Sequence, residues 1–177
     1  MALEINKDLF IEIASLIENQ SDAAIQQLLN DEHHADIAEI LDELNLDQAT
    51  YIIKLLDSEK TSEILMELDD DVRERVLKNL STKEIAEEID ELDSDDAADI
   101  IAELPEELQV RVISELEDDE HKADIRELLA YDEDSAGSLM AKELVKVNEN
   151  WTVPRCVKEM RIQAEEVTRV HLSLIHI

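Results

Sequence analysis

Residues 81–116 read STKEIAEEIDELDSDDAADIIAELPEELQVRVISEL, and a leucine recurs in this stretch every twelve residues. The same spacing continues on both sides without a gap. The leucines of this ladder are Leu44, Leu56, Leu68, Leu80, Leu92, Leu104, Leu116 and Leu128. Each has an apolar residue three positions earlier and most have a β-branched one four positions earlier, a row that only Glu88 and Asp124 interrupt. Such spacings place the apolar side chains on one stripe of a helix.

One unbroken helix cannot carry this ladder. At about 100° per residue, twelve residues advance roughly 120° beyond whole turns, so the leucines would be scattered over three faces. We therefore predict a turn in every unit. Ser81 with Glu84 forms a capping-box pattern, and Pro105 suits a first helical position. The other expected helix caps are Asp47, Asp57, Asp69 and Ser94.

The repeat predicts the fold class. Acid-rich first turns follow every second leucine of the middle ladder, which indicates a two-helix repeat of 24 residues. We predict an all-α protein, a curved solenoid or superhelix of about ten short helices without a strand in residues 6–130, followed by a partial α/β segment. The ladder is expected to form the core. Truncation of Leu80, Leu92 or Leu104 should then cost more stability than truncation of the terminal Leu128.

Composition narrows the range of partners. Against 16 Lys and Arg stand 47 Asp and Glu, a formal net charge of −31, which repels phosphate backbones and excludes nucleic acid as a partner. Such charge also opposes compaction, so bound cations would stabilise the fold; the alternative is that the acidity only confers solubility. With one cysteine, Cys156, and no apolar run of membrane-spanning length, the chain as given is expected to be soluble and without a disulfide.

The helical pattern ends at Tyr131. Residues 132–139 form a polar connector with the only glycine, Gly137. Residues 143–148 alternate between polar and apolar and predict a strand. Thr152 then precedes a predicted helix.

Catalytic patterns are missing from the sequence. No nucleophile with a base, no glycine-rich phosphate loop and no metal triad is visible, so we expect no enzyme. His33 and His34 are adjacent and are interpreted as surface residues, and His121 has no second histidine at ligand spacing, which makes zinc an unsuitable metal.

The leucine units, the YDEDSAGSLM connector at 131–140 and the following strand and WTV helix together resemble the cytosolic half of MgtE-type magnesium transporters. That family has a superhelix of short helices, two cystathionine-β-synthase-type (CBS) modules, a connecting helix and a membrane pore. The resemblance implies an MgtE superhelix at 1–131, a connector at 132–139 and an incomplete CBS module at 140–177. Residues 171–177 depart from the family pattern and are expected not to be native family sequence.

The resemblance also implies a function. Family members hold Mg²⁺ through carboxylates between superhelix and CBS modules, and cytosolic Mg²⁺ closes the pore. Matching stretches carry this role to Asp95 and Asp99 (ELDSDDAAD, 91–99), to Glu63 (TSEIL, 61–65), and to backbone carbonyls of Gly137 and Ser138. The expected partners are Mg²⁺, the protein's own CBS and transmembrane domains, and a second copy in a full-length homodimer at the cytoplasmic side of the cell membrane.

Two alternatives remain at this stage. Asp95 and Asp99 lie four residues apart, on one helix face, and could be either Mg²⁺ ligands or simply acids favoured by the helix dipole. The whole chain could instead be a helical protein-binding scaffold related to flagellar motor-switch proteins, although the CBS-like stretch argues against it. CBS modules often bind adenine nucleotides, but half of one module gives no basis for that prediction.

Overall fold

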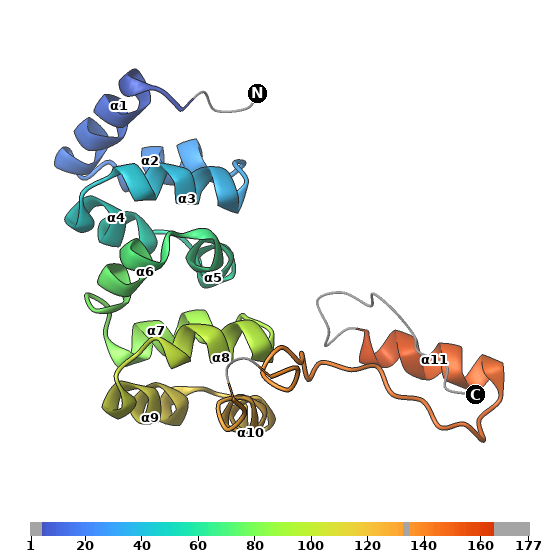
Figure 1. Ribbon diagram of the computed structural model, residues 1–177. Coiled ribbons are helices and arrows are strands. Elements are labelled where there is room, and N and C mark those ends of the chain that lie inside the picture. Colours follow the sequence, from blue (N-terminus) through green and yellow to red (C-terminus); the bar gives the residue numbers. More distant parts are fainter. Residues whose placement is uncertain (1–4, 133–134, 165–177) are drawn as a thin grey trace.

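The computed structural model describes residues 5–132 and 135–164, and these residues form eleven helices and no strand (Figure 1). The helices are α1 (Lys7–Glu18), α2 (Asp22–Leu29), α3 (His34–Glu43), α4 (Leu46–Ile53), α5 (Ser58–Glu67), α6 (Asp70–Leu77), α7 (Thr82–Ile89), α8 (Ser94–Ala102), α9 (Glu106–Glu115), α10 (Asp119–Leu128) and α11 (Val153–Gln163). Helices α1 to α10 confirm the predicted series of short helices. None of the helices described here is long and apolar enough to cross a membrane.

Helices α1 to α10 form a stack in which α1 packs mainly on α2, and the later helices pack mainly on the helix two positions along the chain (Figure 1). The main pairs are α3 with α5, α5 with α7, α7 with α9, α4 with α6, and α8 with α10. This is the packing of a two-helix repeat. Side chains also join successive repeats. Lys54 Nζ donates to Glu84 Oε1 at 2.7 Å, and Arg73 Nε donates to both carboxylate oxygens of Glu103 at 3.1 Å.

Most helix starts follow the sequence signals. Ser81 and Glu84 form the predicted capping box of α7, and the side chain of Asp57 accepts from the amide of Lys60 in α5. Two caps differ. Helix α4 begins earlier than expected, because Asn45 forms its own capping box with Gln48 and leaves Asp47 inside the helix. Ser94 is likewise not a cap but the first residue of α8.

The deepest core is not the leucine ladder itself. The residues three positions before each leucine are all buried: Leu41, Ile53, Leu65, Leu77, Ile89, Ile101, Ile113 and Ile125. Leu80 and Leu92 are only partly buried, whereas Leu104 is 6% and Leu128 2% exposed, so burial does not follow the order in which these leucines were expected to contribute. Leu80 and Leu92 lie in the turns between helices, but so do the buried Leu68 and Leu104, so the packing of neighbouring repeats decides how deeply each leucine is buried.

Glu88 takes a position in α7 that is apolar in most other repeats. Its equivalents Ile64, Val76 and Ile100 are buried, and Glu88 is itself only 9% exposed. Its Oε2 atom is buried without a hydrogen-bond partner. The positions four residues before the leucines are therefore core positions in most repeats, and in α7 this core position holds a carboxyl group.

The segment after the solenoid differs from its prediction. Residues 143–148 have no regular secondary structure, so the predicted strand is wrong for this chain as described. A strand needs a neighbouring strand to share its backbone hydrogen bonds. Here the side-chain amide of Gln163, from α11, takes that place: Lys146 N donates to its Oε1 at 2.6 Å, and its Nε2 donates to Lys146 O at 2.9 Å.

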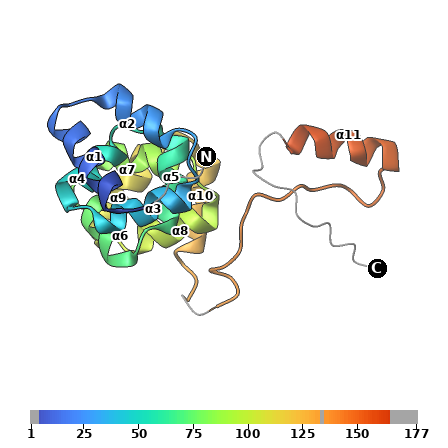
Figure 2. The same cartoon turned by 90° about the horizontal axis from the view of Figure 1, so that it is seen from above.

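Helix α11 forms where the sequence predicted a helix, and it lies apart from the stack in the view from above (Figure 2). None of its residues is buried, and Val153 is 75% exposed. Residues 165–177, which include the segment 171–177 with its departure from the family pattern, lie outside the described part of the chain.

Candidate functional site

The first turn of α8 gathers the acidic residues that the sequence singled out. Asp95 and Asp96 lie in this turn, where the positive end of the helix dipole favours carboxylates. Asp99 follows Asp95 by four residues, so both lie on one face of the helix. Burial raises the pKa of Asp96, and the neighbouring carboxylates of Asp95, Asp93 and Asp99 raise it further. The turn is thus a place where negative charges crowd.

The connector reaches this turn through residues that the sequence did not identify. Ser94 donates to Glu143 through its backbone N–H to Oε1 at 3.0 Å and through its hydroxyl to Oε2 at 3.1 Å. The amide of Lys142 donates to Ser94 Oγ at 3.0 Å. These contacts join residues 48 and 49 positions apart, which no local pattern could indicate. They place the start of the predicted CBS segment at the acidic end of α8.

A hollow of about 560 Å³ lies between this connector and the helices. Asp93, Asp124, Lys142 and Glu143 are among the residues that line it. Lys142 brings a positive charge to this hollow, and its Nζ donates to Glu127 Oε1 of α10 at 2.6 Å. The hydrogen bond from Lys142 lowers the pKa of Glu127.

Gly137 and Ser138 precede this contact in the connector. A Cβ atom at Gly137 would lie 2.6 Å from Cδ1 of Tyr131, so the glycine lets the backbone approach the tyrosine ring closely. The Ser138 hydroxyl donates to the carbonyl of Ser135 at 2.8 Å. Both residues are expected to bind Mg²⁺ through their backbone carbonyls, and this role remains a prediction.

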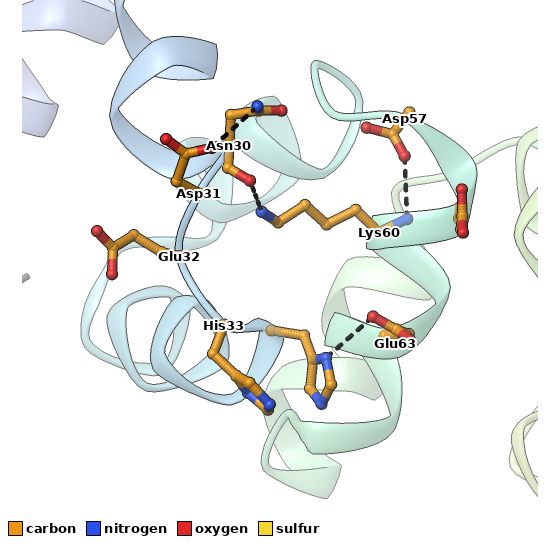
Figure 3. A pocket seen from close by; sticks show the side chains of 9 residues that line it. Asn30, Asp31, Glu32, His33, Asp57, Lys60 and Glu63 are labelled. Atoms are coloured by element: carbon orange, nitrogen blue, oxygen red, sulfur yellow. Dashed lines mark hydrogen bonds and ion pairs between the residues drawn. The ribbon is translucent and has the colours of Figure 1, made fainter. Parts of the chain in front are cut away.

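Glu63 lies at a different place in the stack. It belongs to α5, which packs mainly on α3 and α7, whereas Asp95 and Asp99 belong to α8, which packs on α9 and α10. The Oε2 atom of Glu63 lies 2.9 Å from Nδ1 of His34 (Figure 3). The other ring nitrogen of His34 is 3.8 Å from Glu67 Oε1, so this partly buried histidine lies between two carboxylates of α5.

Figure 3 shows the hollow beside this pair. It measures about 500 Å³ and is lined by the chain between α2 and α3 and by the start of α5. Lys60 crosses it, with Nζ donating to the carbonyls of Leu29 and Asn30 at 2.7 and 2.6 Å. Its ammonium group therefore satisfies carbonyls at the end of α2.

The predicted ligands do not form a complete metal site. No group of three or more His, Cys, Asp or Glu side chains arranged to hold a metal ion occurs among residues 5–132 and 135–164. Asp95 and Asp99 share α8, but Glu63 is on another part of the stack. Mg²⁺ keeps several waters and accepts one or two protein carboxylates, so two aspartates on one face could supply part of a site.

The model of the MgtE intracellular N domain family matches residues 32–134. Among solved structures, the chain is similar to the cytosolic domain of the Mg²⁺ channel MgtE in complex with ATP, with 27% identity and a TM-score of 0.79 over 90% of this chain and 65% of that one. The soluble part of a magnesium transporter has the same fold, with 20% identity and a TM-score of 0.73 over 92% and 64% of the two chains. The chain thus spans less than two thirds of either structure. No curated protein matches it.

Proposed function

The chain belongs to the MgtE intracellular N domain family, and we propose that it is the Mg²⁺-sensing part of a magnesium transporter or channel. The observation that supports this most directly is the crowding of carboxylates at the start of α8, at the point where the connector meets the superhelix. Both similar structures come from magnesium transport proteins. The family match favours this function over the flagellar scaffold alternative, and we propose no catalytic role.

The proposed sensing follows from electrostatics. Two carboxylates about 6 Å apart at an effective dielectric near 20 repel by roughly 3 kcal/mol, and a Mg²⁺ ion between them turns that repulsion into attraction. Asp95 and Asp99 would supply the carboxylates on the superhelix, and a backbone carbonyl of Gly137 or Ser138 would supply an oxygen of the connector. Glu63 would bind Mg²⁺ at a second position, where the ion would compete with His34 for the Glu63 carboxylate.

The rest of the proposal concerns the whole protein. Residues 1–131 would be the superhelix, 132–139 the connector and 140–177 the start of a CBS module, on the cytoplasmic side of the cell membrane. Mg²⁺ bound between superhelix and CBS modules would favour the closed state of a pore, because a ligand shifts an equilibrium toward the state that binds it better. The partners would be the protein's own CBS and transmembrane domains and a second copy. One similar structure contains ATP, but we propose no ATP binding for this chain.

Thermal unfolding of the 177-residue chain tests the cation response. Millimolar Mg²⁺ should raise the melting temperature beyond the effect of NaCl at equal ionic strength, because bridging requires a divalent ion and screening does not. Asp95→Asn should remove much of this excess, and Glu63→Gln a separate part of it. The control Glu18→Gln removes one exposed charge in α1 and should leave the excess unchanged. Equal effects of Mg²⁺ and Na⁺ in the unsubstituted chain would contradict the proposal.

A further inference from the structure

The start of α8 is completed by a side chain from outside the helix. The first amides of a helix have no partner within it and are usually satisfied by the N-cap side chain. Asp93 holds the N-cap position of α8 but makes no side-chain cap hydrogen bond. Glu143 binds the amide of Ser94, the first residue of the helix, and its second oxygen accepts the Ser94 hydroxyl. Ser94 is fully buried and Glu143 is partly buried, so this contact lies at the edge of the solvent-excluded interior.

The residue before Glu143 also binds the neighbouring helix. Lys142 donates its amide to Ser94 Oγ and its ammonium group to Glu127 of α10. Helices α8 and α10 pack directly on each other. Two successive residues just after the connector thus attach to two packed helices, which fixes both the position and the direction of the chain as it leaves the superhelix.

This attachment forms against electrostatic repulsion. Glu143 brings a further carboxylate to a turn that already holds Asp95 and Asp96, and its charge contributes to the raised pKa of Asp96, after burial and the aspartates. Hydrogen bonds to a charged acceptor are strong enough to hold such a contact. A cation at the aspartates would remove part of the opposing repulsion and would therefore strengthen it.

We infer that Lys142 and Glu143 form a latch that docks the end of the connector and the segment after it on α8 and α10, and that a divalent cation at the α8 carboxylates stabilises the latched state. The second half of this inference rests on the proposed function. Ser138 precedes Lys142 by four residues, which span at most about 14 Å, so a closed latch keeps the candidate carbonyl ligands within short reach of α8. The latch residues position the ligands and bind no metal themselves.

Amide hydrogen exchange, followed by NMR on the 177-residue chain, tests the latch. Glu143→Ala should accelerate exchange at Ser94 tenfold or more and should also expose the amide of Lys142. Glu149→Ala is the matched control, because it removes an exposed glutamate of the same segment. Glu143→Gln keeps one acceptor oxygen and should give an intermediate rate. Unchanged exchange at Ile101, inside α8, verifies that the variants remain folded.

The cation is tested in the same experiment. In the unsubstituted chain, Mg²⁺ should slow exchange at Ser94 several-fold beyond NaCl at equal ionic strength, and Glu143→Ala should abolish this difference. Equal Ser94 exchange in Glu143→Ala and Glu149→Ala would overturn the latch, whatever Mg²⁺ does. Faster exchange in Glu143→Ala together with identical effects of Mg²⁺ and Na⁺ would support the attachment and overturn its control by the cation.

Discussion

Glu88 should make the stability of this protein fall as the pH rises. Burial, together with the charges of Glu87, Glu91, Asp57 and Glu84, raises the pKa of Glu88 from 4.5 to about 8. Two of these neighbours lie on α7 itself, Glu91 follows α7, and Asp57 caps α5, so the charges that act most strongly on Glu88 are negative. A protonated carboxyl is thus the form that the folded core accepts at neutral pH.

The magnitude follows from linkage. The folded state favours the protonated form, so its advantage is complete below pH 4.5 and is lost progressively as the pH rises to about 8. At about 1.4 kcal/mol per pH unit, keeping Glu88 protonated at pH 7 costs on the order of 3 kcal/mol. Glu88→Gln, which is always neutral, should remove this cost and stabilise the protein by up to that amount at pH 7, with little effect at pH 4.5.

Urea unfolding followed by circular dichroism at pH 5, 7 and 8.5 measures the effect. The free energy of unfolding of Glu88→Gln should exceed that of the unsubstituted chain by a margin that widens with pH, at an unchanged denaturant slope. Glu91→Gln removes an exposed charge next to Glu88 and controls for general relief of negative charge. A margin for Glu88→Gln that is independent of pH, or equal to that of Glu91→Gln at pH 7, would refute the reasoning.

Two further predictions concern the core and the capping box. Ile89→Ala, at a fully buried position, should cost about 2–5 kcal/mol of unfolding free energy in urea, and Leu80→Ala clearly less; equal losses would contradict the observed burial. The pKa of Glu84 is lowered to about 2 by the hydrogen bond from Lys54 and by those from Ser81. Lys54→Met should therefore move the NMR titration of this carboxyl toward 4.5, and an unchanged titration would show that the lysine contributes little.

Local physics explains why the solenoid could be predicted. The twelve-residue period requires turns, and caps such as Ser81 with Glu84 specify where helices begin from residues three positions apart. The depth of each position was harder to predict. Leu80 and Leu128 have the same place in the period, yet their burial differs, because it depends on how successive repeats stack and not on the pattern within one unit.

The candidate site required information that a local pattern does not contain. The stretch 91–99, which resembles the family pattern, pointed to Asp95 and Asp99. Glu143 could be identified only from the fold, which brings it to Ser94 from 49 residues away. The same contact explains why Ser94, a residue with good capping chemistry, lies inside the helix and not before it: its amide and hydroxyl both donate to an acceptor that the connector supplies. The start of α8 is thus hydrogen-bonded to a residue that lies far from it in the sequence. The acidic turn of α8 and the connector are therefore coupled through hydrogen bonds before any cation binds, and a cation at the aspartates would act on a contact that already exists.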